Sequence, residues 1–233
     1  MEIPRIIHQS WKNEDIPFEI YPAEWQSSWK TNHPEWSYRL WTDHDNRELV
    51  RTEYPDFLDF YDSLDVGIKK ADFCRFLYMH RFGGIYVDLD FISLREMTPL
   101  LYGASIVVGQ LSEDNCYYRI PNAFMASEPG VDFWITVATD AMNAPPEEHG
   151  VERHAGPFRL QWALHKHRPQ GLRTLDQHLV YPLDWINFTK WQDGVHYNQV
   201  NVDLAWNMRQ MDLPSIQARF PQSFAVTTWN HNW

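Results

Sequence analysis

The sequence has little cysteine, no long apolar run and a shortage of positive charge. Its two cysteines, Cys74 and Cys116, are too few for a disulfide framework, which favours a reducing compartment. No apolar run approaches the ~20 residues that span a bilayer, and no apolar signal core follows the N-terminus. We therefore expect a soluble, cytoplasmic protein with no transmembrane segment, for which peripheral association with a membrane stays open.

The net negative charge of the chain bears on which phosphate-containing partners it can bind. Lys and Arg number 20 against 31 Asp and Glu, a formal net charge of -11. Because phosphate backbones need a surplus of basic side chains, nucleic acid is not an expected partner. A nucleotide ligand remains compatible with this charge, since a bound cation can offset the charge of its phosphates.

The remaining composition is that of a globular enzyme or binding protein. Of 233 residues, 44% are apolar, which suits a single domain over residues 1–233. Strand and helix patterns alternate along the chain, and this predicts an α/β fold with a sheet flanked by helices. The expected helices include residues 68–81, 132–143 and 158–167, and the expected strands include 85–92, 106–109, 122–126 and 179–181. The C-terminal quarter shows no clear pattern.

The most informative segment is the run from Gly83 to Asp90. Helix 68–81 ends at Gly83-Gly84, and residues 85–92 alternate as a strand does. In a strand, Asp88 and Asp90 would share one face. Two carboxylates so close need a cation, a shared proton or open water. Carboxylates are hard oxygen ligands that suit Mg²⁺ or Mn²⁺, which in turn bind phosphates. A solvated pair of aspartates without a metal is the alternative.

A second pair of polar residues lies just before this strand. Asp72 and Arg75 are three residues apart on the predicted helix, so their side chains meet on one face. The guanidinium offers a planar fork of donors, and the carboxylate accepts hydrogen bonds from hydroxyls. This pair would suit a sugar ring and its phosphate, and a simple surface ion pair is the alternative.

Taken together, several segments resemble glycosyltransferase family 32, a group of sugar transferases with a DXD motif that is distantly related to the clostridial glucosylating toxins. The resemblance covers most of the chain. In chain order it rests on Ile3–Trp11, Asn32–Asp43, Ala71–Asp90, Asn122–Ala126, Gly156-Pro157 and the Trp-rich end Trp229–Trp233.

The resemblance implies a GT-A fold, a Rossmann-like mixed sheet, and a retaining hexosyl transfer from a UDP- or GDP-sugar such as GDP-mannose to a glycan, lipid-linked or other hydroxyl acceptor. It implies Mn²⁺ or Mg²⁺ as the cofactor. Asp90 would bind this metal, and Asp88 would contact the ribose and reach the metal. Asp72 and Arg75 would bind the donor sugar, and Trp11 would stack near the nucleobase. Asp88, Asp90 and Arg75 are thus the expected catalytic residues.

The C-terminus departs from the family pattern. Relatives often carry a pair of histidines before a Trp, whereas Thr227 and Thr228 stand at these positions here. A metal ligand from this end is expected, either His231 or Asn232, and Trp233 is an expected nucleotide contact.

Two other classes of function stay open. A metal-dependent phosphohydrolase could also use paired aspartates, although further acidic or His ligands on successive strands are not found. A non-catalytic carbohydrate-binding module is favoured by the 12 Trp residues, because their flat rings stack on sugars.

Overall fold

The computed structural model describes residues 2–111, 120–183 and 198–230, and a six-stranded mixed sheet lies at the centre of this part of the chain. The strand order is β2 (Ser37–Trp41), β1 (Ile6–Ser10), β3 (Gly84–Val87), β6 (Phe124–Ser127), β5 (Ile106–Gly109) and β7 (Leu172–Leu175). Strand β6 is antiparallel to both of its neighbours, and all other pairs are parallel. The predicted α/β class with a mixed sheet is confirmed.

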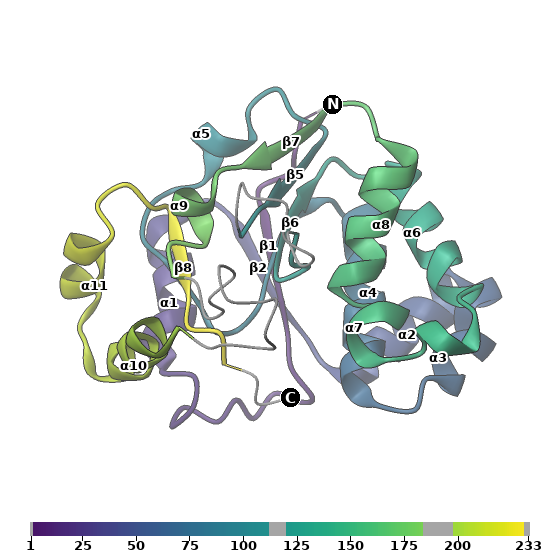
Figure 1. Cartoon of the computed structure of the whole chain (residues 1–233), viewed down its shortest axis with the longest axis horizontal. Helices are drawn as coiled ribbons and strands as arrows, with labels where there is room; N and C mark the ends of the chain where they lie inside the picture. Colours follow the sequence, from purple (N-terminus) through teal and green to yellow (C-terminus); the bar gives the residue numbers. More distant parts are fainter. Residues whose placement is uncertain (1, 112–119, 184–197, 231–233) are drawn as a thin grey trace.

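Helices cover both faces of the sheet (Figure 1). One side carries α2 (Asp43–Glu53), α3 (Leu58–Ser63), α4 (Gly67–Arg81), α6 (Phe133–Met142), α7 (Val151–His154) and α8 (Pro157–His167). The other side carries α1 (Ala23–Asn32), α10 (Gln199–Asn207), α11 (Leu213–Arg219) and a small antiparallel sheet of β4 (Phe91–Ser93) and β8 (Ala225–Thr227). Short helices α5 (Thr98–Leu101) and α9 (Gln177–Val180) lie near β7 and β8, and 3₁₀ turns span Pro55–Phe57, Pro146–Glu148 and Met208–Gln210.

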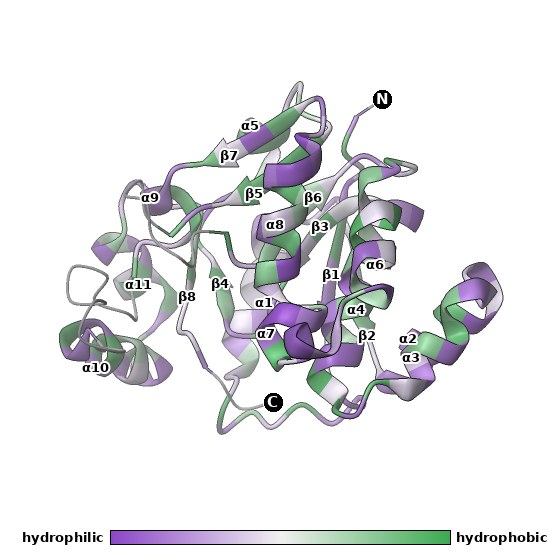
Figure 2. Cartoon of the chain, turned by 45° about the vertical axis from the view of Figure 1, so that its right-hand side comes forward, coloured by the Kyte–Doolittle hydropathy of each residue, from purple (hydrophilic) through white to green (hydrophobic). Residues whose placement is uncertain are grey.

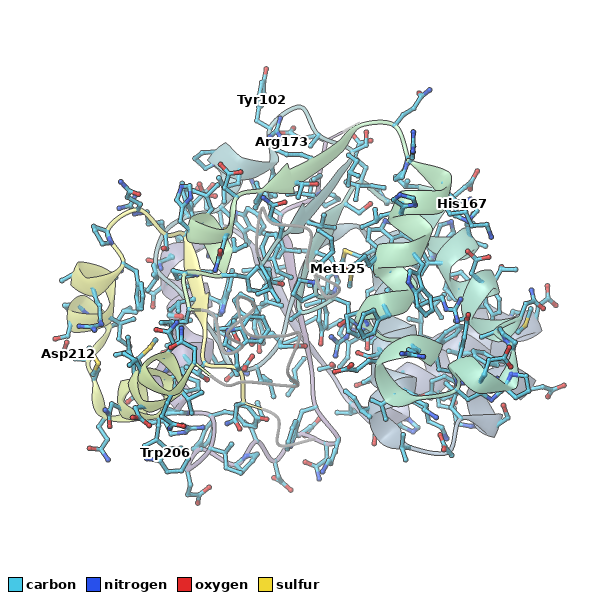
Figure 3. All side chains as sticks on the ribbon, in the orientation of Figure 1. Tyr102, Met125, His167, Arg173, Trp206 and Asp212 are labelled. Carbon is cyan, nitrogen blue, oxygen red and sulfur yellow. The ribbon has the colours of Figure 1, made fainter. Side chains whose placement is uncertain are left out.

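The two sides have separate apolar cores because successive side chains of a strand point to opposite faces. On β3, Tyr86 joins the core under α4 and α6, whereas Ile85 and Val87 join the core under α1. Figure 2 shows the apolar colouring of the central strands, and Figure 3 shows Met125 at the centre of the molecule and Trp206 at its edge. The sheet is thus a rigid base for residues at its strand ends.

Two adjacent glycines connect α4 to β3. Gly83 and Gly84 have φ values of 62° and 85°, in the region that favours glycine. A Cβ at Gly84 would lie 2.5 Å from the carbonyl oxygen of Ile6, and one at Gly83 would lie 2.6 Å from that of Ser127. Only glycine fits both positions, so this turn fixes α4 relative to the strand that follows.

Three expectations from the sequence are wrong. The predicted strand 85–92 is two strands, β3 and β4, in different sheets, with a turn at 88–90. The predicted strand 179–181 lies mostly in helix α9. The C-terminal quarter, expected to be irregular, contains α10, α11 and β8 in its described part. In each case tertiary contacts outweigh a weak local pattern.

Candidate active site

The Asp88-Leu89-Asp90 segment is the turn that takes the chain from the large sheet to the small one. It is pinned by hydrogen bonds from Asp88 N to the Ala123 carbonyl (3.0 Å) and from Phe91 N to the Asp88 carbonyl (3.1 Å). Leu89 enters a third apolar cluster, with Tyr21 and Trp25. The two carboxylates are therefore brought together by a turn and not by one strand face.

Asp88 is bound to residues of α4 and β3. Its Oδ1 lies 3.2 Å from Nη1 of Arg75 and accepts a hydrogen bond of 2.7 Å from the Tyr86 hydroxyl. The same hydroxyl is 3.1 Å from Oγ of Ser10, at the end of β1. The guanidinium of Arg75 also lies 4.6 Å from the centre of the Tyr86 ring. Asp88 is thus held by a cation and a phenol that are themselves buried.

Asp72 shares this cation. Nη2 of Arg75 lies 3.1 Å from Asp72 Oδ1, which also accepts a hydrogen bond of 2.9 Å from Asn122 Nδ2. Burial raises the pKa of Asp72 to about 7, because Arg75 only partly offsets the loss of solvation and Asp88 adds a like charge. The pKa of Arg75 is itself raised: its burial acts against the charge, but Asp88 and other anionic partners outweigh it. One buried cation therefore serves two carboxylates, which explains why the pKa of Asp72 rises despite the ion pair.

Asp90 faces the C-terminal segment instead. Its Oδ2 accepts hydrogen bonds from Thr227 Oγ1 (3.0 Å) and from the backbone N–H of Asn230 (2.6 Å). No Lys or Arg of the described residues forms an ion pair with it. Burial and the charge of Asp88 raise the pKa of Asp90 to about 7, although both hydrogen bonds lower it. This carboxylate is buried next to a like charge, and Arg209 acts on it through its charge without forming an ion pair among the described residues.

Two cavities adjoin this network. The first, of about 120 Å³, is lined by Asp72, Arg75, Asp88, Asp90 and Asn122, and by residues from α7 and the C-terminal segment. The second, of about 330 Å³, is lined by Ser10, Trp11, Lys12, Asp43 and Asn46 among others. Ile68 and Arg75 line both, so the cavities meet at the Arg75 side chain. We call the first the Asp72 cavity and the second the Trp11 cavity.

The side chains expected from the sequence are largely brought together. Asp72, Arg75, Asp88 and Asp90 line the Asp72 cavity, and Trp11 lines the Trp11 cavity, where its ring contacts Tyr21 edge to face. The predicted contacts His231, Asn232 and Trp233 lie outside the described residues. The sequence reading did not assign Tyr86, Asn122 or Thr227. Tyr86 and Asn122 lie inside the segments that resemble the family, Ala71–Asp90 and Asn122–Ala126. Thr227 is 137 residues from its partner Asp90, and no local pattern connects them.

A divalent cation fits this site. Within residues 2–111, 120–183 and 198–230, no group of three or more His, Cys, Asp or Glu side chains converges as a metal cluster would. In the described part, Asp88 and Asp90 are the pair of carboxylates that would hold such an ion. Mg²⁺-type ions are commonly held by one or two carboxylates, with substrate phosphates and water as the other ligands. The buried charge of Asp90, which forms no ion pair among the described residues, would favour binding of such an ion.

The chain matches a known family over part of its length. Residues 22–107 match the family model described as a glycosyltransferase sugar-binding region containing a DXD motif. This segment contains Asp72, Arg75, Asp88 and Asp90. The resemblance to glycosyltransferase family 32 is thereby confirmed, and Asp88-Leu89-Asp90 lies inside the matched segment.

Curated relatives include a mannosyltransferase and a mannosyl phosphorylinositol ceramide synthase. Inositol phosphoceramide mannosyltransferase 3 of Schizosaccharomyces pombe is 45% identical over 100 residues, which cover 43% of this chain and 28% of that protein. Mannosyl phosphorylinositol ceramide synthase SUR1 of Saccharomyces cerevisiae is 40% identical over 99 residues, which cover 42% and 25%. The match thus spans little more than a quarter of the length of these relatives.

A solved structure shows the same fold. The PaToxG glycosyltransferase superposes with a TM-score of 0.55 at 16% sequence identity, covering 71% of this chain and 70% of that one. The fold is GT-A, as expected. In the part of the chain that the structure describes, the helices lack the length and apolar character needed to cross a bilayer.

Proposed function

Because residues 22–107 form a DXD-type sugar-binding region, we propose that this protein is a metal-dependent, retaining glycosyltransferase. It would move a hexose from a UDP- or GDP-sugar to a hydroxyl of a glycan or lipid-linked acceptor. The names of the curated relatives favour mannose as the hexose and a lipid-linked acceptor. The observation that carries the proposal is the convergence of Asp72, Arg75, Asp88 and Asp90 on one cavity.

The two cavities divide the donor between them. The nucleoside would occupy the larger cavity, where Trp11 offers an aromatic face for the base. The hexose would occupy the smaller one, where Asp72 accepts hydrogen bonds from its hydroxyls. The diphosphate would then lie at the junction, beside Arg75. The Nε of Arg75 is buried without a hydrogen-bond partner among the described residues, which leaves it as a donor for a phosphate oxygen.

In the transfer, the bond between the anomeric carbon and the diphosphate oxygen breaks, and a bond from that carbon to the acceptor oxygen forms on the same face. The acceptor hydroxyl gives its proton to the departing diphosphate, so no carboxylate nucleophile is needed. The transition state resembles an oxocarbenium ion. Arg75 would stabilise charge on the leaving oxygens, and Asp72 would hold the hexose in place.

Asp90 would bind the divalent cation directly, and Asp88, oriented by Tyr86 and Arg75, would contact the ribose and reach the cation. When bound, the cation supplies a Lewis acid that neutralises charge on the leaving diphosphate. Thr227 and the backbone of Asn230 would orient the Asp90 carboxylate for this role. His231, Asn232 and Trp233 stay candidates for completing the metal and nucleotide sites.

A donor screen tests the proposal. The protein is incubated with UDP- and GDP-hexoses, with Mn²⁺ or with a chelator, and the release of nucleoside diphosphate is measured. Release that requires the metal is expected with at least one donor. Release of inorganic phosphate from phosphate esters would instead favour a phosphohydrolase, and glycan binding without turnover of any donor would favour a binding module.

A further inference from the structure

Nearly every polar side chain that lines the Asp72 cavity already has a protein partner. Asp72 and Asp88 share Arg75, and Asn122 donates to Asp72. Thr227 donates to Asp90. The exception within the described residues is Glu152, which lines the cavity but forms no hydrogen bond or ion pair there. A carboxylate left unpaired in such a cavity is available to a ligand.

Glu152 lies on the short helix α7, which packs against α4 and α8 (Figures 1 and 2). The absence of a side chain at Gly156 permits this close packing. A Cβ at Gly156 would lie 2.9 Å from the Cα of Glu152 and 3.0 Å from Oδ2 of Asp72. Gly156 thus separates the backbone of Glu152 from the carboxylate of Asp72, and both residues line the same cavity. Figure 1 shows α7 and β8 on opposite sides of the central sheet.

The carboxylate of Glu152 is also partly desolvated. Burial raises its pKa, although the nearby charge of Arg153 acts in the opposite direction, and its own charge contributes to the raised pKa of Asp72. Its neighbour Val151, which lines the same cavity, exposes 43% of its surface. The start of α7 thus presents an apolar side chain and a carboxylate acceptor side by side at the edge of the cavity.

On the basis of the proposed function, we propose that Glu152 is an acceptor-binding residue, whose carboxylate accepts a hydrogen bond from a hydroxyl of the incoming acceptor sugar or polyol. Asp72, Arg75 and Asp88 are committed to the donor and to each other, so they leave the acceptor without a polar contact on this side. A carboxylate is suited to this place because it accepts strong hydrogen bonds from hydroxyls. Val151 would contact the apolar face of the same ring.

The test separates transfer to an acceptor from transfer to water. Wild type, Glu152→Gln and Glu152→Ala are assayed with the active donor and Mn²⁺, with methyl α-mannoside and free inositol as probe acceptors. Nucleoside diphosphate release and glycoside formation are measured together. Because the amide removes a charged acceptor and keeps the shape, we expect Glu152→Gln to raise the acceptor KM about tenfold to a hundredfold. The ratio of transfer to hydrolysis should fall by a similar factor.

Glu147→Gln is the matched control, since Glu147 is an exposed residue of the 3₁₀ turn before α7 and does not line either cavity. It should leave both rates unchanged. An unchanged transfer ratio in Glu152→Gln, or an equal loss of hydrolysis and transfer, would overturn the inference while the proposed function stands. If the wild type releases no nucleotide from any donor, the proposed function fails, and the inference fails with it.

Discussion

The two aspartates of the DXD turn lie two residues apart, yet the protein holds them in different ways. Asp88 faces α4, where Arg75 and Tyr86 contact it. Asp90 faces β8 and the residues after it, where two neutral donors contact it and no cation of the described residues does. We call these the α4 wall and the C-terminal wall of the site.

The difference shows which wall of the site contains ion pairs without a ligand. The α4 wall offsets part of its own charge, because one buried guanidinium forms ion pairs with both of its carboxylates. The C-terminal wall orients Asp90 with neutral donors and gives it no ion pair among the described residues, and burial next to Asp88 raises its pKa. The α4 wall should therefore govern the stability of the fold, and the C-terminal wall should govern metal binding.

Replacing the shared cation should have the largest effect. Arg75→Ala leaves Asp72 and Asp88 buried without a counter-charge, and breaking a buried pair in this way costs about 3–5 kcal/mol. We expect the free energy of unfolding, measured by urea denaturation, to fall by this amount and turnover to be lost. Arg81→Ala breaks the exposed pair with Glu53 at the end of the same helix and should cost less than about 1 kcal/mol. Equal losses in the two variants would contradict the α4 wall as described.

Replacing Asp90 should separate activity from stability. Asp90→Asn and Asp90→Ala should abolish turnover, with a loss of at least about a hundredfold in metal affinity. The fold should persist, because the substitution removes a buried carboxylate charge that has no ion-pair partner among the described residues. Thermal unfolding with and without Mn²⁺ measures both effects: the wild type should gain stability from Mn²⁺, and the variants should not. Full activity in either variant would refute the metal assignment.

The pH dependence of the metal-free protein should report on a buried carboxylate in each wall. Asp72 and Asp90 have folded-state pKa values of about 7, above the ordinary value of 3.8, so between these values the folded state binds more protons than the unfolded state. The contribution of these two carboxylates to stability should therefore fall as pH rises from about 4 to about 7. Burial lowers the pKa of His8 and His154 to about 4, so their contribution rises over the same range and the comparison must be made between variants. In urea denaturation, the stability of the wild type relative to Asp90→Asn should fall as pH rises, and saturating Mn²⁺ should reduce this fall. A stability difference between the two proteins that does not change with pH would contradict the shift of Asp90.

The sequence predicts the α4 wall well and the C-terminal wall poorly. Helix α4, the Gly83-Gly84 turn and strand β3 follow one another, so Asp72, Arg75 and Asp88 can be placed from local periodicity and turn chemistry. The Asp72–Arg75 pair follows from helix spacing, and the Arg75–Asp88 pair follows from the Gly83-Gly84 turn, which brings β3 back alongside α4. Alternation alone could not reveal that the strand ends at Val87, because Leu89 and Phe91 continue the apolar pattern into two different cores.

The C-terminal wall depends on contacts between distant residues. The pairing of β4 with β8 brings Phe91 opposite Thr227, and this register places the threonine next to Asp90. No spacing or propensity in either segment encodes that meeting. The position of Glu152 cannot be predicted from the sequence for the same reason, since it depends on how closely α7 approaches Asp72 across Gly156.

The smallest predicted effect uses two adjacent threonines of the C-terminal wall. Thr227 Oγ1 donates to Asp90 Oδ2, whereas the buried Oγ1 of Thr228 has no hydrogen-bond partner among the described residues. Thr227→Val should weaken Mn²⁺ binding about tenfold, because groups that orient a metal ligand contribute about 10–100-fold in affinity. Thr228→Val removes an unsatisfied hydroxyl of similar shape, so it should leave Mn²⁺ binding unchanged and should not destabilise the fold. Titrating turnover with Mn²⁺ measures both variants, and an equal shift in the two would show that packing at this segment, and not the bond to Asp90, sets metal affinity.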